Sequence, residues 1–154
     1  MIPYIETQLT SVRNYISAGI DAALTVVTAA IGDGLAPPRP LGYSINEIYE
    51  LDQMPWIQVL PDIDNTDIAN IKWDSIDRKV TIIIHVSTTS DIEACAQYIY
   101  RYAEAIRAIV KDNVTMGDSV IGWTIDNINY GTMSTQSNMF KQELWIHCNI
   151  KISE

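Results

Sequence analysis

The stretch that decides the fold lies near the end of the sequence, at residues 140–152. It reads Phe140-Lys141-Gln142-Glu143-Leu144-Trp145-Ile146-His147-Cys148-Asn149-Ile150-Lys151-Ile152. Apart from Gln142, every second residue from Phe140 onward is apolar, and the residues between them are mostly polar. This alternation predicts a β-strand with one core face and a second face that carries Trp145 and His147. At 3.4 Å per residue the strand is about 44 Å long, more than twice the usual length.

The residues before this strand predict its partner. Ile121, Trp123 and Ile125 alternate with polar residues, and the alternation then shifts phase to Ile128 and Tyr130, which indicates a β-bulge. Residues 131–138 are mostly small and polar, as expected of a connection. We therefore expect a long C-terminal β-hairpin over residues 119–153.

The N-terminal residues predict a long helix over about residues 3–31. Its apolar stripe recurs at spacings of three and four, at Ile5, Leu9, Val12, Ile16, Ile20, Ala23, Val27 and Ile31. Gln8 is expected on a polar face, and Gly32 is expected to end the helix as a left-handed C-cap. The longest apolar stretch, residues 22–31, is shorter than the roughly 20 residues of a membrane span, and the N-terminus lacks the basic region of a signal peptide. We therefore expect a soluble protein of a reducing compartment, without membrane association.

A second helix is predicted from the capping box Ser90-Asp91-Ile92-Glu93 to residues 111–113. Arg101, Arg107 and Lys111 are expected to face water on this helix. Its apolar stripe is expected to contain Ile92, Cys95, Ile99, Tyr102, Ala103, Ile106 and Ile109.

Between the two helices the pattern indicates a linker followed by strands. Residues 35–53 are proline-rich at their start, and residues 44–51 fit either a helical turn or a short strand. Residues 56–60 form a strand bracketed by Pro55 and Pro61, which places the strand at a sheet edge or keeps it short. Residues 68–73 and 79–88 predict a hairpin around a turn at residues 74–77. In the second of these strands, Val80, Ile82, Ile84 and Val86 are expected to face the core, opposite Thr81, Ile83, His85 and Ser87.

Together these patterns predict one domain over residues 1–154, in the α+β class. Its sheet is mostly antiparallel, packed on one face by the two long helices. The sheet and second helix are expected over residues 54–113, followed by the C-terminal hairpin.

The composition argues against strong binding to nucleic acid or to anionic membranes. The chain has 19 Asp and Glu against 10 Lys and Arg, a formal charge of −9. Phosphate binding needs a local surplus of basic residues, and the chain has no cluster larger than Arg78-Lys79.

The sequence contains no motif for catalysis, for a cofactor or for a metal ion. Cys95 and Cys148 fall in apolar patterns and are expected to be buried free thiols. His85 and His147 fall on polar strand faces and lack the further ligands that zinc requires. The acidic residues 62–67 lack the EF-hand spacing and indicate a solvated loop. We therefore expect a protein that is not an enzyme and needs no cofactor or metal.

The strand at residues 140–152 is longer than the diameter of about 40 Å expected for a compact chain of this length. Because an uncovered strand edge promotes association, we expect a neighbouring subunit to cover it. The candidate subunit-interface residues are Tyr130, Met133, Met139, Phe140, Trp145 and His147. For Trp145, packing under a loop or under the first helix is an equal alternative.

Three segments carry a resemblance to a known family. They are the proline-flanked strand Pro55–Pro61, the strand-to-helix run Arg78–Val110, and the closing hairpin with Asn129-Tyr130-Gly131 and Glu143–Ile150. In this order of elements the chain resembles bacteriophage tail-terminator (tail-completion, head–tail joining) proteins over most of its length. The family is known by its layout and has no catalytic signature, so no residue acquires a role from the resemblance.

The resemblance implies a structural virion protein that forms a ring, commonly of six subunits. Such a ring caps the tail tube, ends its polymerisation and joins it to the head or neck. The implied partners are further copies of the chain, the tail tube protein and the head or neck connector, while DNA passes through the lumen without specific binding. The implied location is the virion tail or neck, and the host cytoplasm before assembly. The alternatives are another neck or tail component and a small ligand- or protein-binding α+β module without catalysis.

Overall fold

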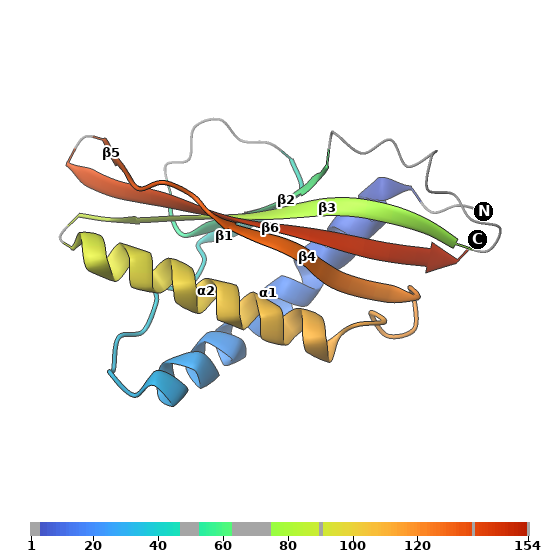
Figure 1. Ribbon diagram of the computed structural model, residues 1–154, viewed down its shortest axis with the longest axis horizontal. Coiled ribbons are helices and arrows are strands. Elements are labelled where there is room, and N and C mark those ends of the chain that lie inside the picture. Colours follow the sequence, from blue (N-terminus) through green and yellow to red (C-terminus); the bar gives the residue numbers. More distant parts are fainter. Residues whose placement is uncertain (1–3, 47–52, 63–74, 90, 137, 154) are drawn as a thin grey trace.

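The structure is a computed structural model that describes residues 4–46, 53–62, 75–89, 91–136 and 138–153. These residues form two helices and a six-stranded sheet (Figure 1). The α+β class predicted from the sequence is confirmed. The helices are α1 (Ile5–Ile31) and α2 (Ile92–Asp112), and the strands are β1 (Gly42–Ser44), β2 (Trp56–Pro61), β3 (Ser75–Thr88), β4 (Gly122–Tyr130), β5 (Ser134–Gln136) and β6 (Met139–Ser153).

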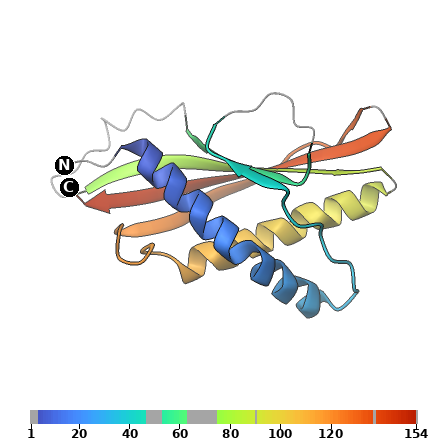
Figure 2. The ribbon, with the colours of Figure 1, turned by 180° about the vertical axis from the view of Figure 1, so that it is seen from behind.

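The strands lie in the order β1-β2-β3-β6-β4, and β5 pairs with the start of β6. All neighbouring pairs are antiparallel except β1 and β2, so the sheet is mixed but mostly antiparallel. Both helices lie on the same face of the sheet (Figures 1 and 2). The strands β3 and β6 run along the long dimension of the molecule, so its elongated shape accommodates their length.

The residues of β6 that face the helices are the alternate apolar residues that the sequence pattern predicted for the core face. Leu144, Ile146, Cys148, Ile150 and Ile152 are buried there. On the neighbouring β4 the predicted bulge is confirmed, because Ile125 lies opposite Cys148 while Asn127 lies opposite His147. Asp126 is therefore the extra residue.

The strand β3 is longer than the sequence pattern predicted. Residues 75–77, expected in a turn, belong to β3 and pair with residues 151–153 of β6. The prediction of a turn at these positions was therefore wrong: the long neighbouring strand offers backbone partners that outweigh the turn preference of Ser and Asp. The predicted strand at residues 68–73 and all but Asp62 of the acidic stretch lie outside the described residues.

Both faces of β3 are more buried than the alternation alone suggested. Val80, Ile82, Ile84 and Val86 are fully buried under the helices, as predicted. On the other face Thr81 and Ile83 are also buried. Ile83 lies between Gln58 of β2 and Trp145 of β6. Cross-strand neighbours of this size shield a central strand from water even on a face without helices.

Of the two alternatives predicted for residues 56–60, a sheet edge or a short strand, the structure shows the short strand. The first half of β2 is covered by β1, which runs parallel to it within the predicted linker. Ser44 therefore belongs to a strand, while residues 47–52 lie outside the described part. The bracketing prolines agree with the shortness of β2, which has six residues.

The helix α1 begins at Ile5, two residues after the predicted start, and ends as predicted at Gly32, whose φ of 76° is the expected left-handed cap. Two side chains differ from the prediction: Gln8 is buried, and Ile31 is exposed. Gln8 directly precedes Leu9 and adjoins the buried stripe, whereas Ile31 extends past the sheet that the stripe packs on.

The helix α1 is also long and apolar enough to cross a membrane. The shorter apolar stretch at residues 22–31 did not indicate this. Core helices of soluble proteins and N-terminal signal sequences meet the same criterion.

The helix α2 is capped by Asp91, whose side chain accepts hydrogen bonds from the N–H groups of Glu93 and Ala94. The predicted cap position, Ser90, lies outside the described residues. Ile92 is exposed, because a residue in the first turn lies at the rim of the sheet rather than over it.

Arg101 was expected to face water and is instead buried. Its guanidinium forms an ion pair with Asp33 and donates to the carbonyl of Leu35. The hydrogen bond from Arg101 holds the pKa of Asp33 below its usual value. On the same helix the Tyr102 hydroxyl donates to the Pro38 carbonyl. The chain that follows α1 therefore runs back along α2, and this return of the chain buries the arginine.

The two cysteines are buried and form no disulfide, which confirms the prediction. Burial raises the pKa of both thiols, that of Cys148 to about 12. Neither thiol is therefore a thiolate at neutral pH.

The bond between Tyr102 and Pro38 can be tested with a matched pair of substitutions. Tyr102→Phe removes one hydrogen bond from a fully buried side chain and is expected to lower the free energy of unfolding by about 1 kcal/mol. Tyr100→Phe, two residues away on the exposed side, is expected to change it by less than about 0.5 kcal/mol. Urea unfolding followed by circular dichroism measures both, and equal effects would contradict this role of Tyr102.

Candidate interaction surfaces

The face of the sheet without helices carries a row of hydrogen-bonded polar side chains centred on His85. The His85 Nε2 lies 2.9 Å from the Gln58 Oε1, and its Nδ1 lies 3.4 Å from the Glu143 Oε1. The Trp145 indole N–H donates to the Glu143 Oε2 at 2.9 Å. The bond with His85, and after it the bond with Trp145, lowers the pKa of Glu143 against the opposing effect of burial. Glu143 is therefore held as a carboxylate beside an imidazole.

A second polar row on the same face is centred on His147. Its Nδ1 lies 3.1 Å from the Thr81 Oγ1, and its Nε2 lies 3.4 Å from the Asn129 Nδ2. The two histidines do not meet: His147 lies opposite Thr81, four positions along β3 from His85, which corresponds to about 13 Å. Among the described residues no three His, Cys, Asp or Glu side chains are placed to hold a metal ion.

The structure divides the candidate interface residues between the two faces of the sheet. Trp145 and His147 lie on the face without helices, with ring centroids 6.5 Å apart. Trp145 is exposed there, so packing under the first helix is wrong. On the helix side, the Tyr130 ring meets the edge of Tyr100 of α2, with centroids 5.4 Å apart.

The remaining candidates lie around the end of β6 where β5 pairs with it. Met133 packs against the core, and Met139 and Phe140 begin β6 as partly buried residues. Candidate residues that are adjacent in one strand thus belong to separate surfaces, because the side chains of a strand alternate between its faces.

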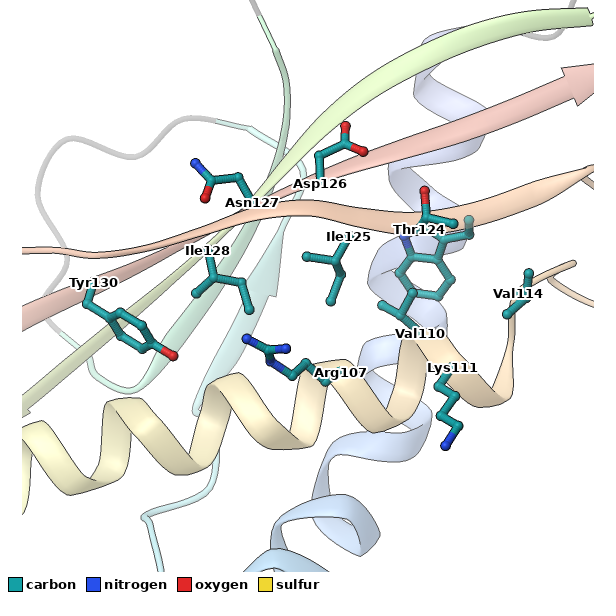
Figure 3. A pocket seen from close by; sticks show the side chains of 11 residues that line it. Arg107, Val110, Lys111, Val114, Thr124, Ile125, Asp126, Asn127, Ile128 and Tyr130 are labelled. Carbon is teal, nitrogen blue, oxygen red and sulfur yellow. The ribbon is translucent and has the colours of Figure 1, made fainter.

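A groove that the sequence reasoning missed runs between α2 and β4 (Figure 3). Its volume is about 570 Å³. Ile125 and Ile128 of β4 point down into it, and Val110 and Trp123 complete an apolar floor. Arg107, Lys111, Val114 and Tyr130 form its rim. The only sequence signal is the spacing of Arg107 and Lys111, one helical turn apart, and that spacing does not show what they border.

The rim of this groove is positively charged within an acidic molecule. Asp126 points away from the groove (Figure 3), and its carboxylate pairs with the Lys79 Nζ at 2.8 Å. The nearest acidic partner of Arg107 is Glu104, at 3.7 Å on the exposed surface of the same helix. Lys111 forms no ion pair with the residues that the structure describes. The positive charge of the groove is therefore largely uncompensated.

No protein-family model matches the chain, and the curated proteins contain no match to its sequence. The function is therefore inferred from the geometry of the chain itself.

The contact between His85 and Glu143 predicts a shift in an acid titration. In His85→Gln the pKa of Glu143 is expected to rise toward its usual value of 4.5. The substitution removes the imidazole, whose hydrogen bond lowers this pKa more than the bond from Trp145 does. His147→Gln is the matched control, since His147 contacts Thr81 and Asn129 instead. Carbon-detected NMR titration of the Glu143 carboxyl measures both variants. An unchanged pKa in His85→Gln would contradict the assigned cause.

The same contact sets the sign of a pH effect on stability. The folded state favours the Glu143 carboxylate, so the contribution is present above pH 4.5 and is lost as the pH falls through the lowered pKa.

Proposed function

We propose that the protein is a structural subunit of a tailed-phage particle that assembles into a ring, with six as the expected number of subunits. The ring caps the tail tube, ends its polymerisation and joins it to the head or neck. Its partners are further copies of the chain, the tail tube protein and the connector. Its location is the virion.

The observation that carries the proposal is the presence of large exposed apolar side chains on both helices. The second half of α1 exposes Val26, at 67 %, and Ile31. On α2 and β4, Tyr100 and Tyr130 are exposed as an edge-to-face pair. The helix α2 lies in front of α1 in Figure 1 and behind it in Figure 2, so the two helices form different sides of the helix layer.

Exposed apolar groups on two different elements suit a head-to-tail contact between subunits. Such a contact repeats from subunit to subunit and closes into a ring when the rotation permits it. A symmetric dimer would instead use one surface twice.

The second support is the long C-terminal hairpin that we assign to β4 and β6, extended by β5. It reaches the end of the molecule with Met133, Met139 and Phe140 around its tip. At this end the partly buried Met133, Met139 and Phe140 lie where a further protein, such as the neighbouring ring of a tail, would cover them. The net charge of −9 suits a conduit, because an acidic lumen repels DNA phosphates and lets DNA pass without binding.

The proposal is tested by the mass and shape of the assembled protein. Light scattering after size exclusion is expected to give about six times the chain mass of 17.3 kDa, and negative-stain microscopy is expected to show rings. The same measurement is made on tail tubes from the particle whose genome encodes the chain, where the protein is expected at one end. A monomer that also fails to bind tube ends would contradict the proposal. Saturable binding of a small molecule by that monomer would favour the binding-module alternative.

The exposed Val26 of α1 provides a point substitution that tests the head-to-tail contact. Val26→Glu places a charge in the proposed contact and is expected to shift the protein from rings to monomers without unfolding it, because Val26 makes no core contact. Ser17→Glu adds the same charge on the opposite, polar flank of α1 and is expected to leave rings intact. Sedimentation velocity measures the assembly of both variants. Rings of unchanged stability in Val26→Glu would exclude Val26 from the contact.

A further inference from the structure

We propose that the groove between α2 and β4 binds an extended, carboxylate-bearing segment of a partner protein, which adds to β4 as a further strand. This goes beyond ring formation: it assigns a separate site to a separate partner, and it does not depend on the ring.

The first argument is the free backbone edge of β4. No other strand pairs with the outer side of β4 among the described residues. The Gly131 N–H donates to the Glu143 carbonyl of β6, so by alternation Asn129 and Asn127 also turn their backbone groups toward β6. The N–H and C=O groups of Ile128 and Tyr130 therefore point outward, where an added strand would pair with them.

The second argument is the apolar groove directly beside this edge. A strand added to β4 would turn alternate side chains toward α2, into the space floored by Val110, Ile125 and Ile128. The volume of about 570 Å³ lies within the range of sites that enclose ligand groups. The groove thus takes apolar side chains at every second position of the added segment.

The third argument is charge, and it selects the chemistry of the partner. The Arg107 guanidinium points from α2 toward β4, below Ile128 (Figure 3), and Lys111 lies one helical turn further along the rim. Arg107 has only the exposed pair with Glu104, Lys111 has no ion pair among the described residues, and the carboxylate of Asp126 is paired with Lys79. An incoming Asp or Glu would therefore find a favourable charge at this rim. The partner segment is therefore one in which apolar and acidic residues alternate.

The edge of β4 also lacks most of the devices that keep strand edges unpaired. Soluble proteins protect such edges with lysine, proline or a bulge. The strand β4 contains neither lysine nor proline, and its bulge at Asp126 precedes residues 127–130. These four residues form a regular edge on which a short strand can add.

The test uses a defined probe, a blocked nonapeptide in which valine alternates with glutamate. Added to the isotopically labelled full chain, this peptide is expected to shift the amide signals of Ile128 and Tyr130 and to slow their hydrogen exchange. A peptide with lysine in place of glutamate is the matched probe and is expected to bind at least tenfold more weakly. Equal binding of the two peptides, or no change at β4 with 1 mM of the acidic peptide, would overturn the proposal.

Two variants separate the charge from the backbone edge. Arg107→Glu is expected to raise the Kd of the acidic peptide about five- to tenfold, because it replaces attraction by repulsion at a partly exposed site. Arg13→Glu makes the same change of charge on α1 and is expected to leave the Kd unchanged. Ile128→Pro removes an outward N–H that the sheet does not use, and it is expected to abolish the added strand while β4 and β6 stay paired.

The remaining outcome concerns a second copy of the chain. If the labelled chain self-associates through Ile128 and Tyr130, and Ile128→Pro abolishes that association, the groove belongs to a neighbouring copy and the proposed foreign segment is overturned. Loss of peptide binding with intact rings would leave the proposed function standing. Peptide binding by a chain that forms no rings would contradict the proposed function and leave the proposed strand addition standing.

Discussion

The antiparallel pairing of β3 with β6 is the constraint on which the rest of the structure depends. All fourteen residues of β3 have a partner in β6, from Ser75 opposite Ser153 to Thr88 opposite Phe140. Because side chains alternate along both strands, this one register assigns each of them to the helix side or to the free side. If β6 slipped by one residue against β3, Ile146 would turn to the free face and His147 toward the helices, while Ile82 stayed on the helix side. The core and the polar face are thus two results of the same register.

The helices depend on this sheet and on each other. The buried faces of α1 and α2 cover the side that β3 and β6 make apolar, and the chain between α1 and β1 is held against α2 by Arg101 and Tyr102. A buried guanidinium is stable only with its hydrogen bonds satisfied, and here Asp33 and the Leu35 carbonyl satisfy them. The return of the chain along α2 also brings Gly42–Ser44 beside β2, where they add the one parallel strand.

The edges of the sheet differ in a way that bears on function. At one end β1 is three residues long, whereas at the other end β4 presents nine residues beside an apolar groove with a cationic rim. A molecule with a net charge of −9 that keeps Arg107 and Lys111 beside an open edge has a polarised surface. Such a surface suits a protein that contacts different neighbours in different directions.

The sequence by itself determined whatever depends on residues close together in the chain. The alternation in residues 140–152, the bulge before Ile128, the length of α1 and its end at Gly32 all follow from local periodicity and backbone preference, and all are present in the structure. Only the tertiary structure decided which distant segments meet. It extended β3 into an expected turn, added β1, buried Arg101 through Asp33, and separated Tyr130 from Trp145 onto opposite faces. The groove between α2 and β4 belongs to this second class. Its lining comes from two elements whose separation and angle are set by packing on the sheet, and local periodicity carries no information about that packing.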